Sequence, residues 1–150
     1  MYNYEDIKSI HLEVTQNCQA ACPMCDRNCS GEGVNPHIKL DELSLEDCKR
    51  IFSPSFIAQL NTMYMCGNLG DPIVAKDTLE IFRYFRKHNS QMWLSMNTNA
   101  GAQSETWWAK LADIFGRMGS VIFSVDGLED TNHLYRQGVS WKAVERSMDA

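Results

Sequence analysis

Four short apolar segments, spaced along the chain, have the pattern of buried β-strands. They are rich in β-branched, aromatic and long apolar residues and cover residues 7–14, 62–66, 91–96 and 121–125. Each is too short to be a helix that crosses a membrane, and no apolar run elsewhere reaches that length. We therefore predict four strands and no membrane-embedded segment.

Helical patterns occupy the intervals between these strands. The first covers 44–52 and opens with the Ser-x-x-Asp spacing of a capping box. A second helix begins at Asp77, and a third is capped by Ser104 and closed by Gly119. A last helix begins near Ser140. Strands that alternate with helices at intervals of this length are typical of βαβ units, which predicts an α/β fold with a parallel sheet.

Polar clusters follow each predicted strand. The clusters are a cysteine-rich run after 7–14, then 67–72, then 97–101, and finally 124–127. The carboxyl ends of parallel strands meet at one edge of a sheet, where α/β proteins bind their ligands. We therefore expect all four clusters to converge on one site.

Composition limits the classes of function. The chain has 150 residues, of which 44% are hydrophobic and 22% charged, which is enough for one core and one domain. Its net charge is −5 and its lysines and arginines are scattered, so no nucleic-acid partner is expected. The acidic N-terminus has no apolar stretch behind it, which favours a cytoplasmic protein.

Three cysteines stand in the spacing C-x3-C-x2-C: Cys18, Cys22 and Cys25. In a chain without a secretory signal, so tight a triplet indicates metal binding and not a disulfide framework. Three thiolates in eight residues can wrap one metal centre. A cubane 4Fe–4S cluster takes four ligands, so one iron would stay open for chemistry.

This spacing resembles the cluster loop of the radical S-adenosylmethionine (radical SAM) enzymes, and three later segments resemble the same family in the same order. Residues 69–72, Leu-Gly-Asp-Pro, resemble its Gly-Gly-Glu-Pro segment. Residues 98–101, Thr-Asn-Ala-Gly, are similar to its Thr-Asn-Gly signature. Residues 123–127, followed by His133 and Arg136, resemble its Ser-x-Asp-Gly…His…Arg pattern. The last two signatures are closest to the peptide-maturing, SPASM-like branch.

The resemblance implies a set of site residues. The cluster ligands would be Cys18, Cys22 and Cys25, and Met24 stands where the family usually has an aromatic residue near adenine. The implied S-adenosylmethionine-binding residues are Met24, Gly67, Gly70, Asp71, Asn99, Ser124, Asp126 and Arg136. Arg136 has a second interpretation, as a partner in a surface ion pair.

The resemblance also implies an activity. A 4Fe–4S cluster and S-adenosylmethionine would be the cofactors, and reductive cleavage would give a 5'-deoxyadenosyl radical that takes hydrogen from an unidentified peptide or small molecule. A flavodoxin or ferredoxin would supply electrons. The family's barrel usually has six strand-helix units and we count four, so residues 1–150 are expected to form a partial (β/α) barrel, a radical SAM core domain that is incomplete at its C-terminus.

The remaining cysteines leave an alternative open. A structural zinc site on a non-catalytic α/β module could use the triplet together with Cys29, with or without His37. Cys29 could otherwise be a spare thiol or part of a second metal site. Cys48 and Cys66 are predicted to be core thiols.

Overall fold

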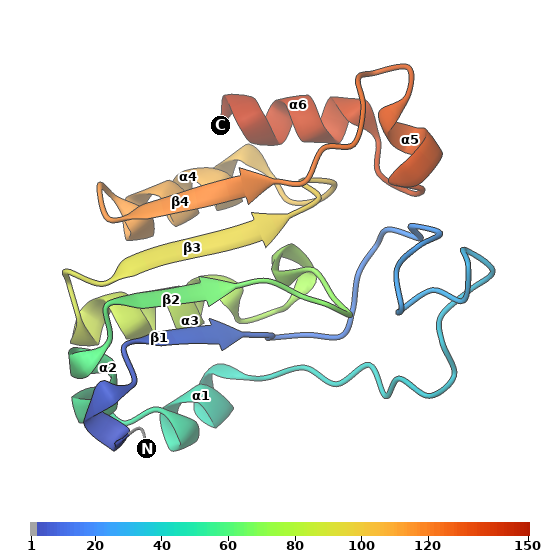
Figure 1. The fold of residues 1–150 in the computed structure, drawn as a ribbon. Helices are drawn as coiled ribbons and strands as arrows, with labels where there is room; N and C mark the ends of the chain where they lie inside the picture. Colours follow the sequence, from blue (N-terminus) through green and yellow to red (C-terminus); the bar gives the residue numbers. More distant parts are fainter. Residues whose placement is uncertain (1–2) are drawn as a thin grey trace.

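The computed structural model describes residues 3–150 and has a single four-stranded parallel sheet in the order β1-β2-β3-β4 (Figure 1). The strands are β1 (Ser9–Leu12), β2 (Thr62–Met65), β3 (Trp93–Thr98) and β4 (Gly119–Phe123). The predicted α/β class and the parallel sheet are confirmed. Because strand order follows chain order, each crossover carries the chain one strand further along the sheet.

Helices connect the strands and continue after β4. They are α1 (Leu45–Ile51), α2 (Pro54–Gln59), α3 (Thr78–His88), α4 (Glu105–Phe115), α5 (Asn132–Tyr135) and α6 (Trp141–Asp149), with short 3₁₀ turns η1 (Tyr4–Asp6) and η2 (Pro72–Val74). None of the helices within residues 3–150 has the length and apolar character that crossing a membrane requires.

The main core lies between the sheet and the helices drawn behind it in Figure 1. Alternate strand residues point into this core. Met63 and Met65 of β2 are therefore fully buried, while Thr62 and Tyr64 of the same strand are only partly buried. Phe82 and Phe85 of α3 belong to the same core and are also fully buried. This layer holds the strand ends in place.

Serine caps fix the starts of three helices where the sequence predicts them. The capping box of α1 is complete, since Ser44 Oγ accepts from Asp47 N and Asp47 accepts from Ser44 N. The Ser104 side chain caps α4 by accepting from the N–H of Trp107, and the Ser140 side chain caps α6 by accepting from the N–H of Ala143. Cys48 is fully buried, as predicted for a core thiol.

Several predicted boundaries are wrong. β1 is shorter than 7–14, and α2 and α5 are additional to the predicted helices. Asp77 does not cap its own helix, because its carboxylate instead accepts from the backbone N–H of Leu45 in α1. The third helix ends at Gly116, whose positive φ of 54° suits glycine, and Gly119 begins β4.

Candidate functional site

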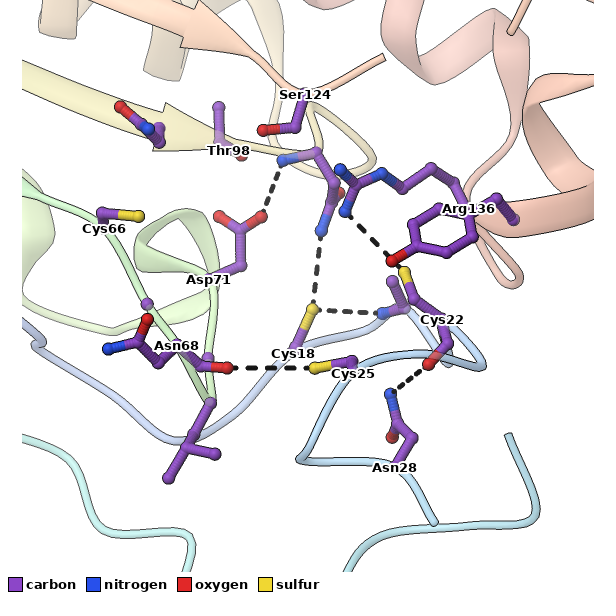
Figure 2. Close-up of a pocket in the computed structure, with 17 residues that line it drawn as sticks. Cys18, Cys22, Cys25, Asn28, Cys66, Asn68, Asp71, Thr98, Ser124 and Arg136 are labelled. Carbon is purple, nitrogen blue, oxygen red and sulfur yellow. Dashed lines mark hydrogen bonds between the residues drawn. The ribbon is translucent and has the colours of Figure 1, made fainter. Parts of the chain in front are cut away.

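A cavity of about 290 Å³ opens at the carboxyl ends of the strands (Figure 2). Segments that follow each of the four strands contribute to its wall, as the parallel topology leads one to expect. Nine of the eleven residues predicted for the site line it: Cys18, Cys22, Cys25, Gly67, Gly70, Asp71, Asn99, Ser124 and Arg136.

The three cysteines of the triplet are free thiols on one side of this cavity. Backbone hydrogen bonds shape their loop: Cys25 N donates to the carbonyl of Cys22 at 3.2 Å, and Ala20 N donates to Cys18 Sγ at 3.4 Å. The Cys25 thiol faces the carbonyl of Asn68, which belongs to the segment after β2, at 3.9 Å (Figure 2). The loop after β1 and the loop after β2 therefore share one wall.

Burial raises the pKa of the Cys18 thiol to about 11, although the hydrogen bond from Ala20 N and the charge of Arg27 act in the opposite direction. Burial therefore disfavours the thiolate form of Cys18. A metal held by this thiol would bind the thiolate, so its binding would release the proton.

Within residues 3–150, no group of three or more His, Cys, Asp or Glu side chains converges closely enough to hold a single metal ion. A tetrahedral zinc site needs all of its ligands within bonding distance of one ion. A cubane makes a different demand, because its thiolates bind separate irons of one cluster. The donor set on this cavity, three thiols on one loop, fits that second demand.

Gly70 allows the segment after β2 to approach the chain that leaves β1, and Gly67 allows that segment to turn tightly on itself. A Cβ built on Gly70 would lie 2.0 Å from the carbonyl oxygen of Thr15, and one on Gly67 would lie 2.0 Å from the carbonyl oxygen of Gly70. No side chain fits at these distances. Gly70 thereby places Asp71, whose N–H donates to the carbonyl of Asn17 at 2.8 Å, beside the loop that carries the cysteine triplet (residues 15–28, called the cluster loop below).

The Asp71 carboxylate is buried and joins two strand ends. It accepts a hydrogen bond from Asn99 N at 2.8 Å, after β3, and from Ile73 N at 3.1 Å, in η2. Burial raises the pKa of Asp71, while these two N–H groups oppose the shift. The two carboxylate oxygens therefore connect the backbone of η2 to the backbone that follows β3.

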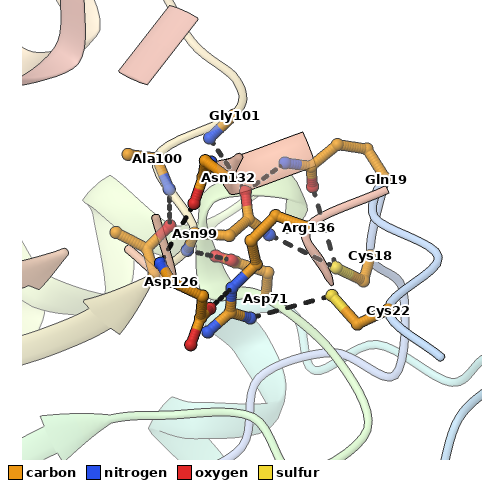
Figure 3. Close-up of polar contacts among 11 residues, drawn as sticks. Cys18, Gln19, Cys22, Asp71, Asn99, Ala100, Gly101, Asp126, Asn132 and Arg136 are labelled. Atoms are coloured by element: carbon orange, nitrogen blue, oxygen red, sulfur yellow. Dashed lines mark hydrogen bonds and ion pairs between the residues drawn. The ribbon is translucent and has the colours of Figure 1, made fainter. Parts of the chain in front are cut away.

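Asn99 connects the end of β3 to the cluster loop (Figure 3). Its Oδ1 accepts from Gln19 Nε2 at 2.5 Å and from Gly101 N at 2.8 Å, and its Nδ2 lies 3.5 Å from Cys18 Sγ. Gln19 is not among the residues that the sequence predicts. The sequence gives little indication that Gln19 belongs to the site, because a glutamine between two cysteines is ordinary in a polar loop.

Arg136 forms an ion pair with Asp126 and also lines the cavity, with Nη1 3.8 Å from Cys22 Sγ (Figure 3). Burial disfavours its charge, but the Asp126 carboxylate outweighs burial and raises the pKa of Arg136. The ion pair predicted for Arg136 is therefore confirmed, and its contact with a cofactor stays a prediction. Asp126 does not line the cavity and acts on it through Arg136.

Met24 also lies outside the cavity. It is 83% exposed, on the outer side of the loop in a shallow groove that it shares with the exposed Cys29. Cys66 differs from its prediction as a core thiol, because it is only partly buried and lines the cavity after β2. Asn28 and Tyr135 line the cavity as well, and neither stands in a motif that predicts it.

No family model and no curated protein matches the chain. Solved structures do match. "Crystal structure of BtrN in complex with AdoMet and 2-DOIA" matches with a TM-score of 0.63 and 13% identity, over 93% of this chain and 55% of that one. A histidine-tagged anSMEcpe with bound AdoMet matches with a TM-score of 0.69 and 19% identity, over 95% of this chain and 39% of that one.

A second structure of the latter protein, with bound AdoMet (S-adenosylmethionine) and the Cp18Cys peptide, matches with a TM-score of 0.68 at 19% identity, over 95% of this chain and 39% of that one. At these identities the likeness shows a shared fold. The chain spans between 39% and 55% of the length of the chains it matches.

Proposed function

We propose that residues 1–150 form a radical SAM core domain that binds a 4Fe–4S cluster through Cys18, Cys22 and Cys25 and S-adenosylmethionine beside it. The observation that carries this proposal is the single cavity in which the C-x3-C-x2-C thiols meet segments from all four strand ends. The neighbours of like fold support it, since they are radical SAM enzymes whose structures contain AdoMet.

The residues of this chain have distinct tasks in the proposal. When bound, the cluster supplies the electron that cleaves S-adenosylmethionine to a 5'-deoxyadenosyl radical. Gly70 keeps backbone close to the cluster loop, and Gly67 keeps the turn before it tight, since a Cβ at either position would clash with backbone. The Ser124 hydroxyl and the Arg136 guanidinium are the donors on the wall for the ribose and carboxylate of the cofactor.

The proposal extends beyond these residues. Asp71, Asn99 and Asp126 support the cofactor wall through the contacts described above, and the substrate is a peptide or a small molecule. A flavodoxin or ferredoxin would deliver the electron. The Thr98-Asn99 and Ser124–Gly127 segments are the reason for preferring the SPASM-like branch.

Replacement of single cysteines tests the cluster assignment. Cys18→Ala, Cys22→Ala and Cys25→Ala should each abolish cluster binding, because the triplet is already one ligand short of a saturated cubane. Iron, sulfide and visible absorbance after anaerobic reconstitution give the measurement. The unaltered protein should hold about four irons and four sulfides per chain.

Cys29→Ala, Cys48→Ala and Cys66→Ala are the matched controls and should retain the cluster, since Cys29 and Cys66 are not in the triplet and Cys48 lies in the core. A Cys29→Ala protein that loses the metal as fully as Cys22→Ala would refute the ligand assignment. A colourless protein that contains one zinc per chain would refute the proposal and support the alternative, a non-catalytic module with a structural zinc site.

A further inference from the structure

Arg27 is a buried cation without an anionic partner. Its side chain and backbone together are only 6% exposed, two residues after Cys25. The ion pairs within residues 3–150 involve other side chains, and no carboxylate lies within ion-pair distance of this guanidinium. Burying a charge is costly unless an opposite charge or a full set of hydrogen bonds compensates for it.

The hydrogen bonds of Arg27 fix its position behind the cluster loop. Its Nε donates to the carbonyl of Gln16 at 3.0 Å, before the triplet, and its Nη1 donates to Asn28 Oδ1 at 3.0 Å, after it. Asn28 is itself buried, lines the cavity, and donates to the carbonyl of Cys22 at 3.4 Å. Arg27 and Asn28 thus close the loop from its two ends.

These bonds use only part of what a guanidinium offers, which is five N–H donors and a full positive charge. Neutral acceptors satisfy the two bonds named, so the charge itself is left uncompensated. Asn28, which accepts from Arg27, lines the cavity and donates to the carbonyl of Cys22, so the guanidinium lies directly behind the triplet. An anion that compensates the charge of Arg27 would therefore lie on the cavity side of the cluster loop.

We propose that Arg27 is the counter-charge of this site: a buried cation that offsets the negative charge of three thiolates and the cluster they hold. This inference rests on the proposed function, because the anion is the thiolate-bound cluster. Arg27 does not line the cavity and is not a ligand, so it acts as a positioning and tuning residue through the loop.

A fixed cation has a direct consequence for reduction. The reduced cluster carries one more negative charge than the oxidised cluster, so a nearby positive charge stabilises the reduced form more than the oxidised form. Net charge, hydrogen bonds and solvent exposure set the potentials of such clusters. Arg27 should therefore raise the reduction potential and make the cluster easier to reduce.

The test is the midpoint potential of the reconstituted cluster, measured by an EPR-monitored redox titration. Arg27→Gln removes the charge and keeps a donor, and should move the potential to a more negative value. At the wild-type midpoint, the reduced fraction should then fall severalfold below one half. Arg117→Gln removes an equal charge from an exposed site near the amino end of β4, away from the cavity, and should leave the potential unchanged.

Two further variants separate charge from loop geometry. Arg27→Lys keeps the charge without the planar fork, so it should bind less cluster at a potential close to that of wild type. Asn28→Ala loosens the loop and keeps the charge, with the same expected result. If Arg27→Gln binds no cluster, the midpoint potential of Arg27→Lys is the deciding measurement. A potential equal to that of wild type supports the counter-charge, and a shifted potential overturns it.

The two proposals fail in different ways. A wild-type protein that takes up no cluster refutes the proposed function. A wild-type protein with a normal cluster, whose potential is the same in Arg27→Gln, refutes the role of Arg27 and leaves the proposed function standing.

Discussion

Among individual residues, Asp71 connects the segments that follow β2 and β3. Its carboxylate joins η2 to the end of β3 through Ile73 N and Asn99 N, and Asn99 in turn reaches Cys18. A short side chain suits this position, because Gly70 before it brings the backbone close to the cluster loop. The aspartate where the family has a glutamate is thus matched to the backbone contacts it makes.

Asp71→Asn gives a pH-dependent change in stability. The amide keeps one acceptor and turns a donor toward a buried N–H, which should cost about 1–3 kcal/mol at neutral pH. Because burial raises the pKa of Asp71, the folded state binds its proton more tightly than the unfolded chain does. The difference in free energy of unfolding between wild type and Asp71→Asn should therefore be largest below about pH 3.9, the pKa of aspartate in the unfolded chain. It should shrink as pH rises through the raised pKa of Asp71 in the folded state.

Urea unfolding of the cluster-free proteins across this pH range measures the difference. Asp113→Asn, at an exposed position of α4, controls for the loss of one negative charge. A wild-type advantage that grows with pH would show that the two backbone N–H groups outweigh burial at this carboxylate.

At the scale of elements, Arg86 is the main connection between α3 and the turn that leads to β4. Its guanidinium donates to five backbone carbonyls at 2.8–3.2 Å, which belong to Ser90, Met92, Ile114, Phe115 and Met118. These acceptors match the five N–H donors that a guanidinium offers. The last carbonyls of α4 and the start of β3 are thereby held by one side chain.

Arg86→Met should destabilise the fold by about 3 kcal/mol, since it leaves several partly buried carbonyls without a charged donor. Arg83→Met, one turn earlier, removes only an exposed ion pair with Glu80 and should change stability by no more than about 0.5 kcal/mol. Chemical denaturation of both variants gives the comparison. Equal losses would mean that the carbonyl contacts of Arg86 add nothing to those of an ordinary helix residue.

The elements can be predicted where the signal is local. The serine caps and the apolar strand centres depend on neighbours within a few residues, and they predict all four strands and four of the helices. The role of Arg86 escapes such a prediction, because most of its acceptors lie about 30 residues away along the chain and no local pattern marks them. Asp77 precedes α3 as predicted, but local sequence does not reveal its hydrogen-bond partner, because Leu45 belongs to another helix.

At the scale of the whole molecule, topology predicts the location of the site better than its detail. Parallel strands in chain order bring together segments from Cys18 to Arg136, and the polar clusters after the strands indicate this convergence. The side chains are harder to assign. Met24 points outward and Cys66 faces the cavity, since the direction of a side chain in a loop depends on the turn, which spacing does not fix.

This convergence predicts how the molecule would respond to the proposed cofactor. Since the cavity wall comes from all four strand ends, S-adenosylmethionine bound to cluster-loaded protein should protect amides after β1, β2, β3 and β4 together in hydrogen exchange. At a free concentration of 100 times Kd, the ligand should add about 2.7 kcal/mol of stability. For a chain of this size, that corresponds to a rise in melting temperature of about 5–10 °C.

Cys22→Ala, which should bind no cluster, is the control and should show neither the protection nor the rise. Protection confined to the loop after β1 would mean that the ligand contacts the cluster loop alone, and the later strand ends would then have no part in binding. Protection at all four ends would instead support a ligand that spans the cavity from the triplet to Ser124 and Arg136.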